Sequence, residues 1–141
     1  MSNRMILKTI ETLTMKASLS SDDIVRVMLK KNSEIDSDAT LKNIKAYIEL
    51  TNNNKYAFII FAEDSSVVYT EDARKNAKIN EQLFEKVCIA VIVKTLAHRL
   101  ITNFYFKFYK PGYPFKVFTN VNEAEDWCLK ECTKIQKADL V

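Results

Sequence analysis

The sequence predicts an α/β fold: helices on a mainly parallel mixed sheet of four to five strands, starting with a β-hairpin and carrying about four helices. Residues 56–62 (YAFIIFA) and 87–93 (VCIAVIV) are continuous apolar runs of strand length, typical of central strands covered on both faces. Segments with helical spacing follow these runs. A chain of 141 residues, 48% of them hydrophobic, has the size of one domain, so we expect a single domain over residues 1–141.

The first elements are expected to form the hairpin. Residues 5–17 end in an alternation of apolar and polar side chains, which predicts a half-buried strand. Residues 24–30 (IVRVMLK) predict a second strand, and the composition of residues 18–23 (SLSSDD) indicates the turn between them.

A helix should then begin with Asp36 or Ser37 as its N-cap and end at residues 52–54 (NNN). Its inward face is predicted to carry three apolar side chains at helical spacing, Leu41, Ile44 and Ile48.

The second half of the chain predicts three further helices and a last strand. The helices are expected from Glu71 to about Phe84, from about Leu96 to Tyr109, and from about Asn122 to Lys137. Residues 114–119 (PFKVFT) form the strand, and Trp127 is the expected inward anchor of the last helix.

Charge and aromatic side chains are concentrated in one part of the chain. Residues 86–122 contain six lysines and arginines and no acidic residue, although the net charge of the whole chain is +3. Within this window, residues 103–118 hold eight of the fifteen aromatic residues, the only glycine and both prolines. Six basic residues fall short of a nucleic-acid interface, so no specific nucleic acid is expected as a partner.

On a helical projection, the helix 96–109 divides into two faces. The predicted core face consists of Leu96, Ala97, Leu100, Ile101, Phe104 and Phe108. The predicted outer face consists of His98, Arg99, Thr102, Asn103, Phe106 and Lys110, with Tyr105 and Tyr109 at the border.

Phe106 is an apolar ring on this polar face, and three explanations are open. It packs against the following loop, where Tyr113 and Phe115 are available; it belongs to a self-association surface; or it meets an anionic ligand, a lipid head group or a nucleic acid beside the neighbouring cations. We therefore predict that Arg99, Asn103, Phe106, Lys110, Tyr105, Tyr109 and Tyr113 form an interaction surface or a ligand contact.

Several chemistries lack the residues they need. One glycine cannot supply a phosphate-binding or dinucleotide-binding loop; Gly112 is instead predicted to provide the positive φ of a type II turn. The one histidine, His98, is expected on the solvent side, where it has no nucleophile at a motif spacing. Cys128 and Cys132 are expected to pack against the core rather than bind a metal.

Residues 98–128 (HRLITNFYFKFYKPGYPFKVFTNVNEAEDWC) carry a set of motifs at Arg99-x-Ile101-x-Asn103-Phe104-Tyr105, Lys110-Pro111-x-x-Pro114, Phe118-Thr119 and Glu123-Ala124-x-x-Trp127. In this set the chain resembles small bacterial proteins of the STAS-like (SpoIIAA-like) superfamily, over roughly residues 20–132. The resemblance implies a sheet of four or five strands with helices, similar to anti-sigma-factor antagonists and loosely to lipid-carrying SEC14 domains. It implies no established activity.

In the anti-sigma-factor antagonists, a phosphorylatable serine opens the helix after the third strand. Here Asp64-Ser65-Ser66 lies in that region, but Val67 replaces the glycine of the family motif and the helix is predicted to start later, after Thr70. The resemblance therefore offers Ser66 or Thr70 as a phosphorylation site, whereas the residues themselves favour Thr70 as an ordinary N-cap.

Together these observations predict a non-enzymatic cytoplasmic interaction module of STAS-like type. We expect it to form a homodimer through the aromatic and basic surface and to bind an unidentified protein partner, with no cofactor, catalytic residue or metal. The N-terminus lacks a secretory pattern, no apolar run reaches a membrane span, and three cysteines without framework spacing indicate reduced thiols. The alternative is a binder or carrier of a small amphipathic or anionic, lipid-like ligand, held between helix 96–109 and the KPGYP loop.

Overall fold

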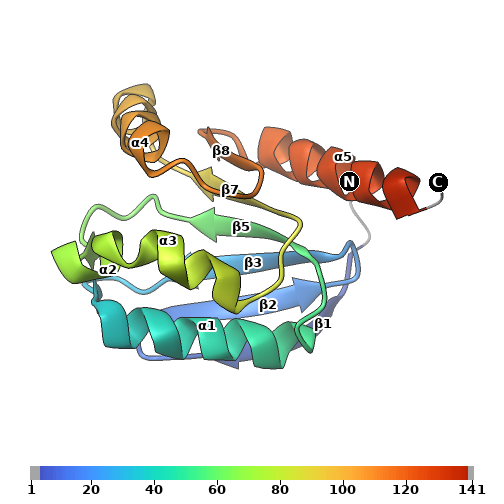
Figure 1. Ribbon diagram of the computed structural model, residues 1–141, viewed down its shortest axis with the longest axis horizontal. Coiled ribbons are helices and arrows are strands. Elements are labelled where there is room, and N and C mark those ends of the chain that lie inside the picture. Colours follow the sequence, from blue (N-terminus) through green and yellow to red (C-terminus); the bar gives the residue numbers. More distant parts are fainter. Residues whose placement is uncertain (1–3, 140–141) are drawn as a thin grey trace.

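The computed structural model describes residues 4–139, apart from the side chains of Ile101 and of residues 104–109 and 136–139. Its centre is a six-stranded sheet with the order β1-β2-β3-β5-β7-β8 (Figure 1). β1, β2 and β3 are antiparallel, whereas β3, β5, β7 and β8 run parallel. The strands are Ile6–Glu11, Met15–Ser20, Ile24–Leu29, Ala57–Phe61, Cys88–Ile92 and Phe115–Phe118. The α/β class, the mainly parallel sheet and the initial hairpin are confirmed.

The N-terminal region forms two strands where the sequence predicted one. The predicted strand 5–17 is interrupted after Glu11, because the Thr12 hydroxyl accepts hydrogen bonds from the N–H groups of Thr14 and Met15, both at 3.2 Å. The chain therefore reverses and β1 pairs with β2. β2 extends to Ser20 and shortens the predicted turn, in which Asp23 takes a positive φ of 64°. The main sheet consequently has one strand more than expected.

Helix α1 (Ser37–Thr51) begins as predicted, with the Asp36 carboxylate accepting the N–H of Ala39 at 2.8 Å. It ends at Asn52, whose φ of 53° is a left-handed helix stop. The predicted inward face needs one correction, because Leu41 is 48% exposed. The face that packs on the sheet carries Ile44, Tyr47 and Leu50.

The predicted helix 71–84 is broken into three short pieces: α2 (Glu71–Lys75), α3 (Ala77–Asn80) and the 3-10 turn η1 (Glu81–Leu83). Thr70 caps α2, as predicted. The break falls at Asn76, whose side-chain amide donates to the Ser37 hydroxyl at 3.1 Å and so binds this segment to the start of α1. Two further short strands, β4 (Glu34–Ile35) and β6 (Val68–Tyr69), pair beside it.

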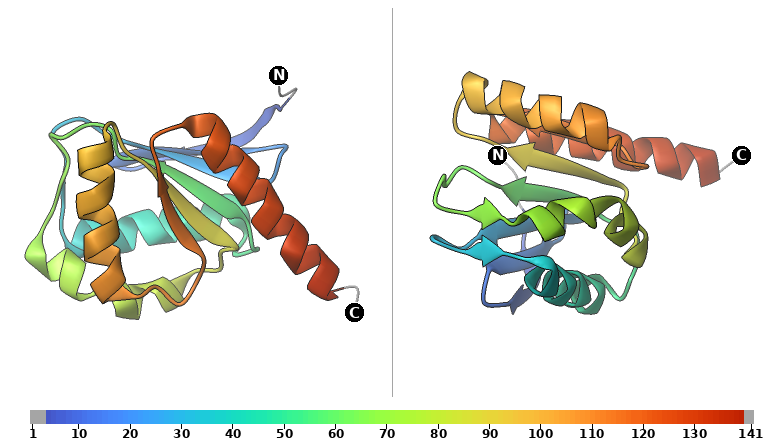
Figure 2. Two further views of the ribbon diagram at one scale, coloured as in Figure 1. Left: turned by 90° about the horizontal axis from the view of Figure 1, so that it is seen from above. Right: turned by 60° about the vertical axis from the view of Figure 1, so that its left-hand side comes forward.

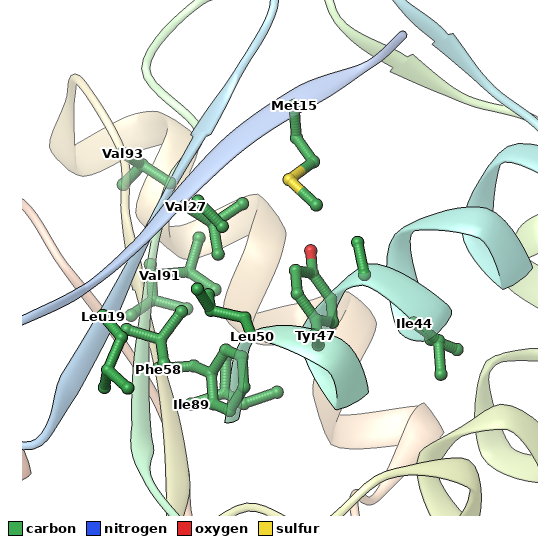
Figure 3. Close-up of a cluster of buried hydrophobic side chains, with 14 residues drawn as sticks. Met15, Leu19, Val27, Ile44, Tyr47, Leu50, Phe58, Ile89, Val91 and Val93 are labelled. Atoms are coloured by element: carbon green, nitrogen blue, oxygen red, sulfur yellow. The ribbon is translucent and has the colours of Figure 1, made fainter. Parts of the chain in front are cut away.

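Two apolar layers lie on the two faces of the sheet. On one face, α1 contributes to a cluster that includes Phe58, Val91 and Tyr47 (Figure 3). On the other face, α5 (Val121–Asp139) packs its small side chains on the alternate residues of the same strands. The Trp127 ring packs against Phe118, with ring centres 5.7 Å apart, as expected of an inward anchor. α4 (Leu96–Tyr109) and α5 lie on opposite sides of the β7–β8 edge (Figure 2).

The three cysteines belong to the α5 layer. Cys88 and Cys128 are buried, and Cys132 packs against the same cluster. A hydrogen bond with Cys128, together with burial, raises the pKa of the Cys88 thiol, and burial raises that of Cys132. A raised thiol pKa lowers the reactive thiolate fraction of Cys88 and Cys132, so these two cysteines act as packing groups.

Candidate functional site

A cleft of about 1400 Å³ opens on the α1 side of the sheet, between α1, the broken segment α2–α3–η1, and α4. Its floor is formed by apolar side chains of the parallel strands and their flanks. These floor residues are Ile60, Ile89, Val91, Val93 and Phe115. The floor is apolar because the side chains of central strands point alternately to two faces of the sheet that are both normally buried. Here a helix packs on only part of one of these faces.

The cleft stays open because the segment that crosses it is short and carries small side chains. Ala73 of α2 and Ala77 of α3 face the floor across the cleft, whereas the large side chains Ile79 and Leu83 of this segment are exposed. An unbroken amphipathic helix would have placed its large apolar side chains on the sheet. The break at Asn76 thus leaves the central strands partly uncovered.

Helix α4 forms the far wall, and its orientation differs from the prediction. Leu96 and Leu100, assigned to the core face, are 56% and 60% exposed, and Ala97 is exposed as well. His98 and Thr102, assigned to the solvent face, line the cleft. The prediction assumed that the apolar arc lies on the sheet; α4 instead stands across the cleft from it, with His98 and Thr102 inward. The side chains of Ile101, Phe104 and Phe108, also assigned to the arc, lie outside the described residues.

Aromatic rings close one end of the cleft. Tyr47, Phe58 and Phe84 form a triangle in which each pair of ring centres is 5.3 Å apart. Tyr113 and Phe115 form a second pair, 6.5 Å apart. Because aromatic groups at such separations attract each other edge to face, this end is a rigid apolar surface.

Lys86 lies between these two aromatic groups. Its Nζ is 4.0 Å from the ring centre of Phe84 and 4.9 Å from that of Tyr113. It donates to the main-chain carbonyls of Glu81 at 2.5 Å and of Phe84 at 2.9 Å. Burial lowers the pKa of Lys86, which indicates an ammonium group in partly dry surroundings.

Tyr47 places a phenol in the cleft wall. Its side chain is only 8% exposed, and its hydroxyl forms no hydrogen bond with any residue in the described part of the chain. Burial, followed by the nearby Tyr69, raises the pKa of Tyr47, so the phenol is neutral. This hydroxyl is unpaired within the described chain and borders the cavity, so it is available to a polar group placed there.

The other end of the cleft carries charges of both signs. Lys94, Arg74 and His98 lie there together with Glu63 and Asp64. Arg74 donates to the main-chain carbonyl of Tyr69. Hydrogen bonds from Ser66, and more weakly the charge of Lys94, hold the pKa of Asp64 below its usual value. This end therefore has little net charge.

The KPGYP segment is a loop between α4 and β8, but the predicted type II turn is wrong and its glycine has a different role. Gly112 has no positive φ; Lys110 takes it instead, with a φ of 51° just after α4. The Gly112 N–H donates to the Glu81 carboxylate at 3.1 Å, and a Cβ at this position would lie 2.8 Å from that oxygen. The Gly112 backbone thus approaches the end of the flexible Glu81 side chain closely, and this contact joins the loop to η1.

The structure describes the side chains of four of the seven predicted surface residues. Tyr113 lines the cleft, whereas Asn103 and Lys110 are exposed and Arg99 is half-buried. The side chains of Tyr105, Phe106 and Tyr109 lie outside the described residues. Sequence reasoning missed Tyr47, Phe84 and Lys86. A lysine directly before the buried run 87–93 was the one available signal for Lys86.

Both candidate phosphorylation residues have structural roles. The Ser66 hydroxyl donates to Asp64 at 2.6 Å and accepts the N–H of Asn32 at 2.7 Å. The Thr70 hydroxyl donates to Asp72 and accepts the N–H of Ala73 at 3.4 Å. These hydrogen bonds do not bear on phosphorylation, so the phosphorylation of Ser66 or Thr70 stays a prediction.

Two kinds of feature are absent from the described residues. Among them, no group of three or more His, Cys, Asp or Glu side chains is arranged to hold a metal ion. Within the same part of the chain, no helix has the length and apolar character needed to cross a bilayer.

Residues 18–132 match the family described as Domain of unknown function (DUF7793). The chain belongs to the DUF7793 family. The matched residues run from β2 into α5, so the cleft of this DUF7793 protein, from Leu29 to Phe115, lies entirely within them. None of the curated proteins matches the chain.

The DUF7793 chain is similar in structure to an uncharacterized protein from the DUF3478 family with a SpoIIAA-like fold, from Shewanella loihica PV-4. The TM-score is 0.55 and the identity 12%, over 91% of this chain and 98% of that one. At this identity the likeness concerns the fold alone. It confirms the SpoIIAA-like fold predicted from the motifs of residues 98–128.

Proposed function

We propose that this DUF7793 protein is a non-enzymatic binding protein that holds a small amphipathic ligand in the cleft beneath α4. The observation that carries the proposal is the cleft itself, with about 1400 Å³ over an apolar floor and a few polar groups at its walls and ends. Ligand pockets have this composition, and their volumes are usually roughly 300–1,000 Å³. The cleft thus has room for a ligand with a long apolar part.

The polar groups are placed as an amphipathic ligand requires. The Tyr47 hydroxyl and the Lys86 ammonium both border the cleft, and neither is paired with a carboxylate of the described chain. An apolar ligand body would displace poorly bound water from the floor, while its polar end would satisfy one of these groups. The α4 wall, with His98 and Thr102 inward, closes the same space.

Native mass spectrometry of gently purified protein, followed by denaturing spectra of the same sample, tests this proposal. We expect a stoichiometric extra mass that disappears on denaturation. Ala77→Phe, which fills the cleft from α3, should abolish it, whereas Ala97→Phe on the exposed side of α4 should retain it. An extra mass that both variants retain would place the ligand elsewhere. A wild type with no extra mass, and no uptake of an added amphiphile, would refute a ligand function.

A second candidate is a docking module for a protein partner with an acidic surface. Leu96, Leu100 and Asn103 follow one another at helical spacing and are exposed on α4. They lie in the window 86–122, which has six basic and no acidic residues. The exposed leucines support an interface, and the charge favours an acidic partner over a second copy of the same surface.

Leu100→Ser and Lys110→Glu test this second candidate. Both variants should lose the capture of the same acidic protein, and both should keep the melting temperature of the wild type. Lys130→Glu, which changes an exposed lysine on α5 instead, should leave capture intact. Capture that is insensitive to both α4 variants would contradict the surface. The homodimer expected from the sequence stays a prediction, and the same native spectra measure it.

A further inference from the structure

We infer that the ligand of the cleft carries a carboxylate head and that Lys86 binds this head between the rings of Phe84 and Tyr113. This inference rests on the proposed ligand-binding function and adds the class of ligand and its direction in the cleft. The apolar body would extend from Lys86 along the strand floor, towards Val91 and Val93.

Lys86 forms no direct ion pair within the described chain, although the charges of Glu81 and Glu85 act on it and partly offset the lowering of its pKa by burial. An ammonium group has three N–H donors, and two of them are used by the carbonyls of Glu81 and Phe84. No acidic side chain of the described chain lies within ion-pair distance of it. The nearest candidate, the Glu81 carboxylate, is bound by Lys78 at 3.2 Å and by the Gly112 N–H at 3.1 Å. One donor of Lys86 is therefore available, and its charge is not neutralised by a direct ion pair.

The partly dry surroundings of Lys86 strengthen its contact with an anion. Phe84 and Tyr113 flank the ammonium, and burial lowers the pKa of Lys86. A charge in partly dry surroundings gains more from an opposite charge than an exposed one does. Lys94, at the other end, is exposed and shares its region with Glu63 and Asp64, so an anion there would gain less.

The groups at the Lys86 end of the cleft also favour one type of anion. A phosphate carries up to two negative charges and is usually bound by an arginine fork or by several N–H groups of a helix start. The Lys86 end offers a single point charge with one free donor, and the nearby Gly112 N–H is already used. One cation between two rings matches a singly charged, small head, which is a carboxylate.

Isothermal titration calorimetry with dodecanoate and dodecan-1-ol, each below its micelle concentration, tests the inference on the full chain. The two probes share their apolar chain and differ in the head. A charge-assisted contact predicts that the wild type binds dodecanoate at least about tenfold more tightly than the alcohol. Dodecyl phosphate should bind no more tightly than dodecanoate.

Variants then assign the preference to Lys86. Lys86→Gln should lose the preference for dodecanoate, because its affinity for dodecanoate should fall about tenfold while its affinity for the alcohol stays within about twofold. Lys86→Arg should retain the preference. Lys116→Gln removes the same charge from the same basic window but on the opposite face of β8, where Lys116 lies 5.4 Å from the Phe118 ring. It should leave both affinities unchanged. If Lys86→Gln does not fold, the ratio of the two affinities in the wild type and in Lys86→Arg still tests whether a cation at this position binds the carboxylate.

The outcomes separate the two proposals. Equal affinity of the wild type for both probes would overturn the role of Lys86 and leave the cleft as a binding site. The same would follow from a preference that Lys86→Gln retains. Tighter binding of dodecyl phosphate would overturn the carboxylate. If neither dodecanoate nor the alcohol binds, the proposed ligand-binding function fails together with the inference.

Discussion

Arg26 of β3 and Glu125 of α5 form an ion pair of 2.5 Å, and the same guanidinium is bound by Asp22 at 2.8 Å. The Arg26 side chain is largely buried, and its Nε has no partner in the described chain. Arg4 also reaches Glu125, at 3.1 Å. This network joins the start of the chain, the β2–β3 hairpin and the last helix, so it fixes α5 on its face of the sheet.

Glu125→Gln should therefore destabilise the fold. Removing the charge leaves a mostly buried guanidinium with one carboxylate in place of two, and loss of one partner of such a pair lowers the free energy of unfolding by about 1–3 kcal/mol. Urea unfolding followed by circular dichroism measures this. Glu123→Gln, an exposed position on the same helix, is the control and should change the midpoint little. Equal effects of the two variants would argue that the network contributes nothing specific.

Tyr47→Phe should leave the free energy of unfolding unchanged or raise it by up to about 1 kcal/mol. The hydroxyl has no hydrogen-bond partner in the described chain, whereas the ring packs against Phe58 and Phe84. Removing an unsatisfied polar group is neutral or favourable. Tyr47→Ala should instead lose about 3–5 kcal/mol with the ring. A clear loss of stability in Tyr47→Phe would mean that the hydroxyl has a structural partner after all.

The central strands and the starts of α1 and α2 could be predicted because their signals are local. The apolar runs 56–62 and 87–93 became β5 and β7, and Asp36 and Thr70 cap the helices expected of them. A continuous apolar run or a capping hydroxyl has the same meaning in most surroundings. Such features can be recognised without knowing which elements pack against each other.

The cleft could not be predicted, because it depends on which face of each helix meets the sheet. The apolar arc of α4 suggested Leu96 and Leu100 as core, but the helix stands across the cleft and turns His98 and Thr102 inward. The break of residues 71–83 at Asn76 depends on a contact with Ser37, which is 39 positions away in the chain. The spacing of apolar residues along the chain indicates neither the orientation of α4 nor the contact between Asn76 and Ser37.

Lys110→Gly should raise the free energy of unfolding by about 1 kcal/mol. Lys110 adopts the left-handed region just after α4, where a side chain is unfavourable and glycine is preferred. The Lys110 carbonyl, which accepts from Lys78 at 2.8 Å, is retained by the substitution. Gly112→Ala should change the free energy of unfolding little, because Gly112 has no positive φ and the new Cβ meets only the end of the flexible Glu81 side chain, which can shift. Thermal and urea unfolding compare the two; a destabilised Lys110→Gly would contradict this account of the turn.

Asp72 should give the fold a dependence on acid pH. Hydrogen bonds from the Thr70 hydroxyl and from Ser37 lower the pKa of Asp72 from 3.8 to about 2. Because the native value lies below that of the unfolded chain, the carboxylate stabilises the fold above about pH 4, and this contribution is lost as the pH falls through about 2. Asp72→Asn should thus melt below the wild type at pH 7, and the difference should shrink towards zero near pH 2. Melting curves between pH 7 and pH 2 measure the difference, with Asp126→Asn, an exposed acid of α5, as the control. A difference that is constant over this range would mean that the Asp72 charge does not stabilise the start of α2.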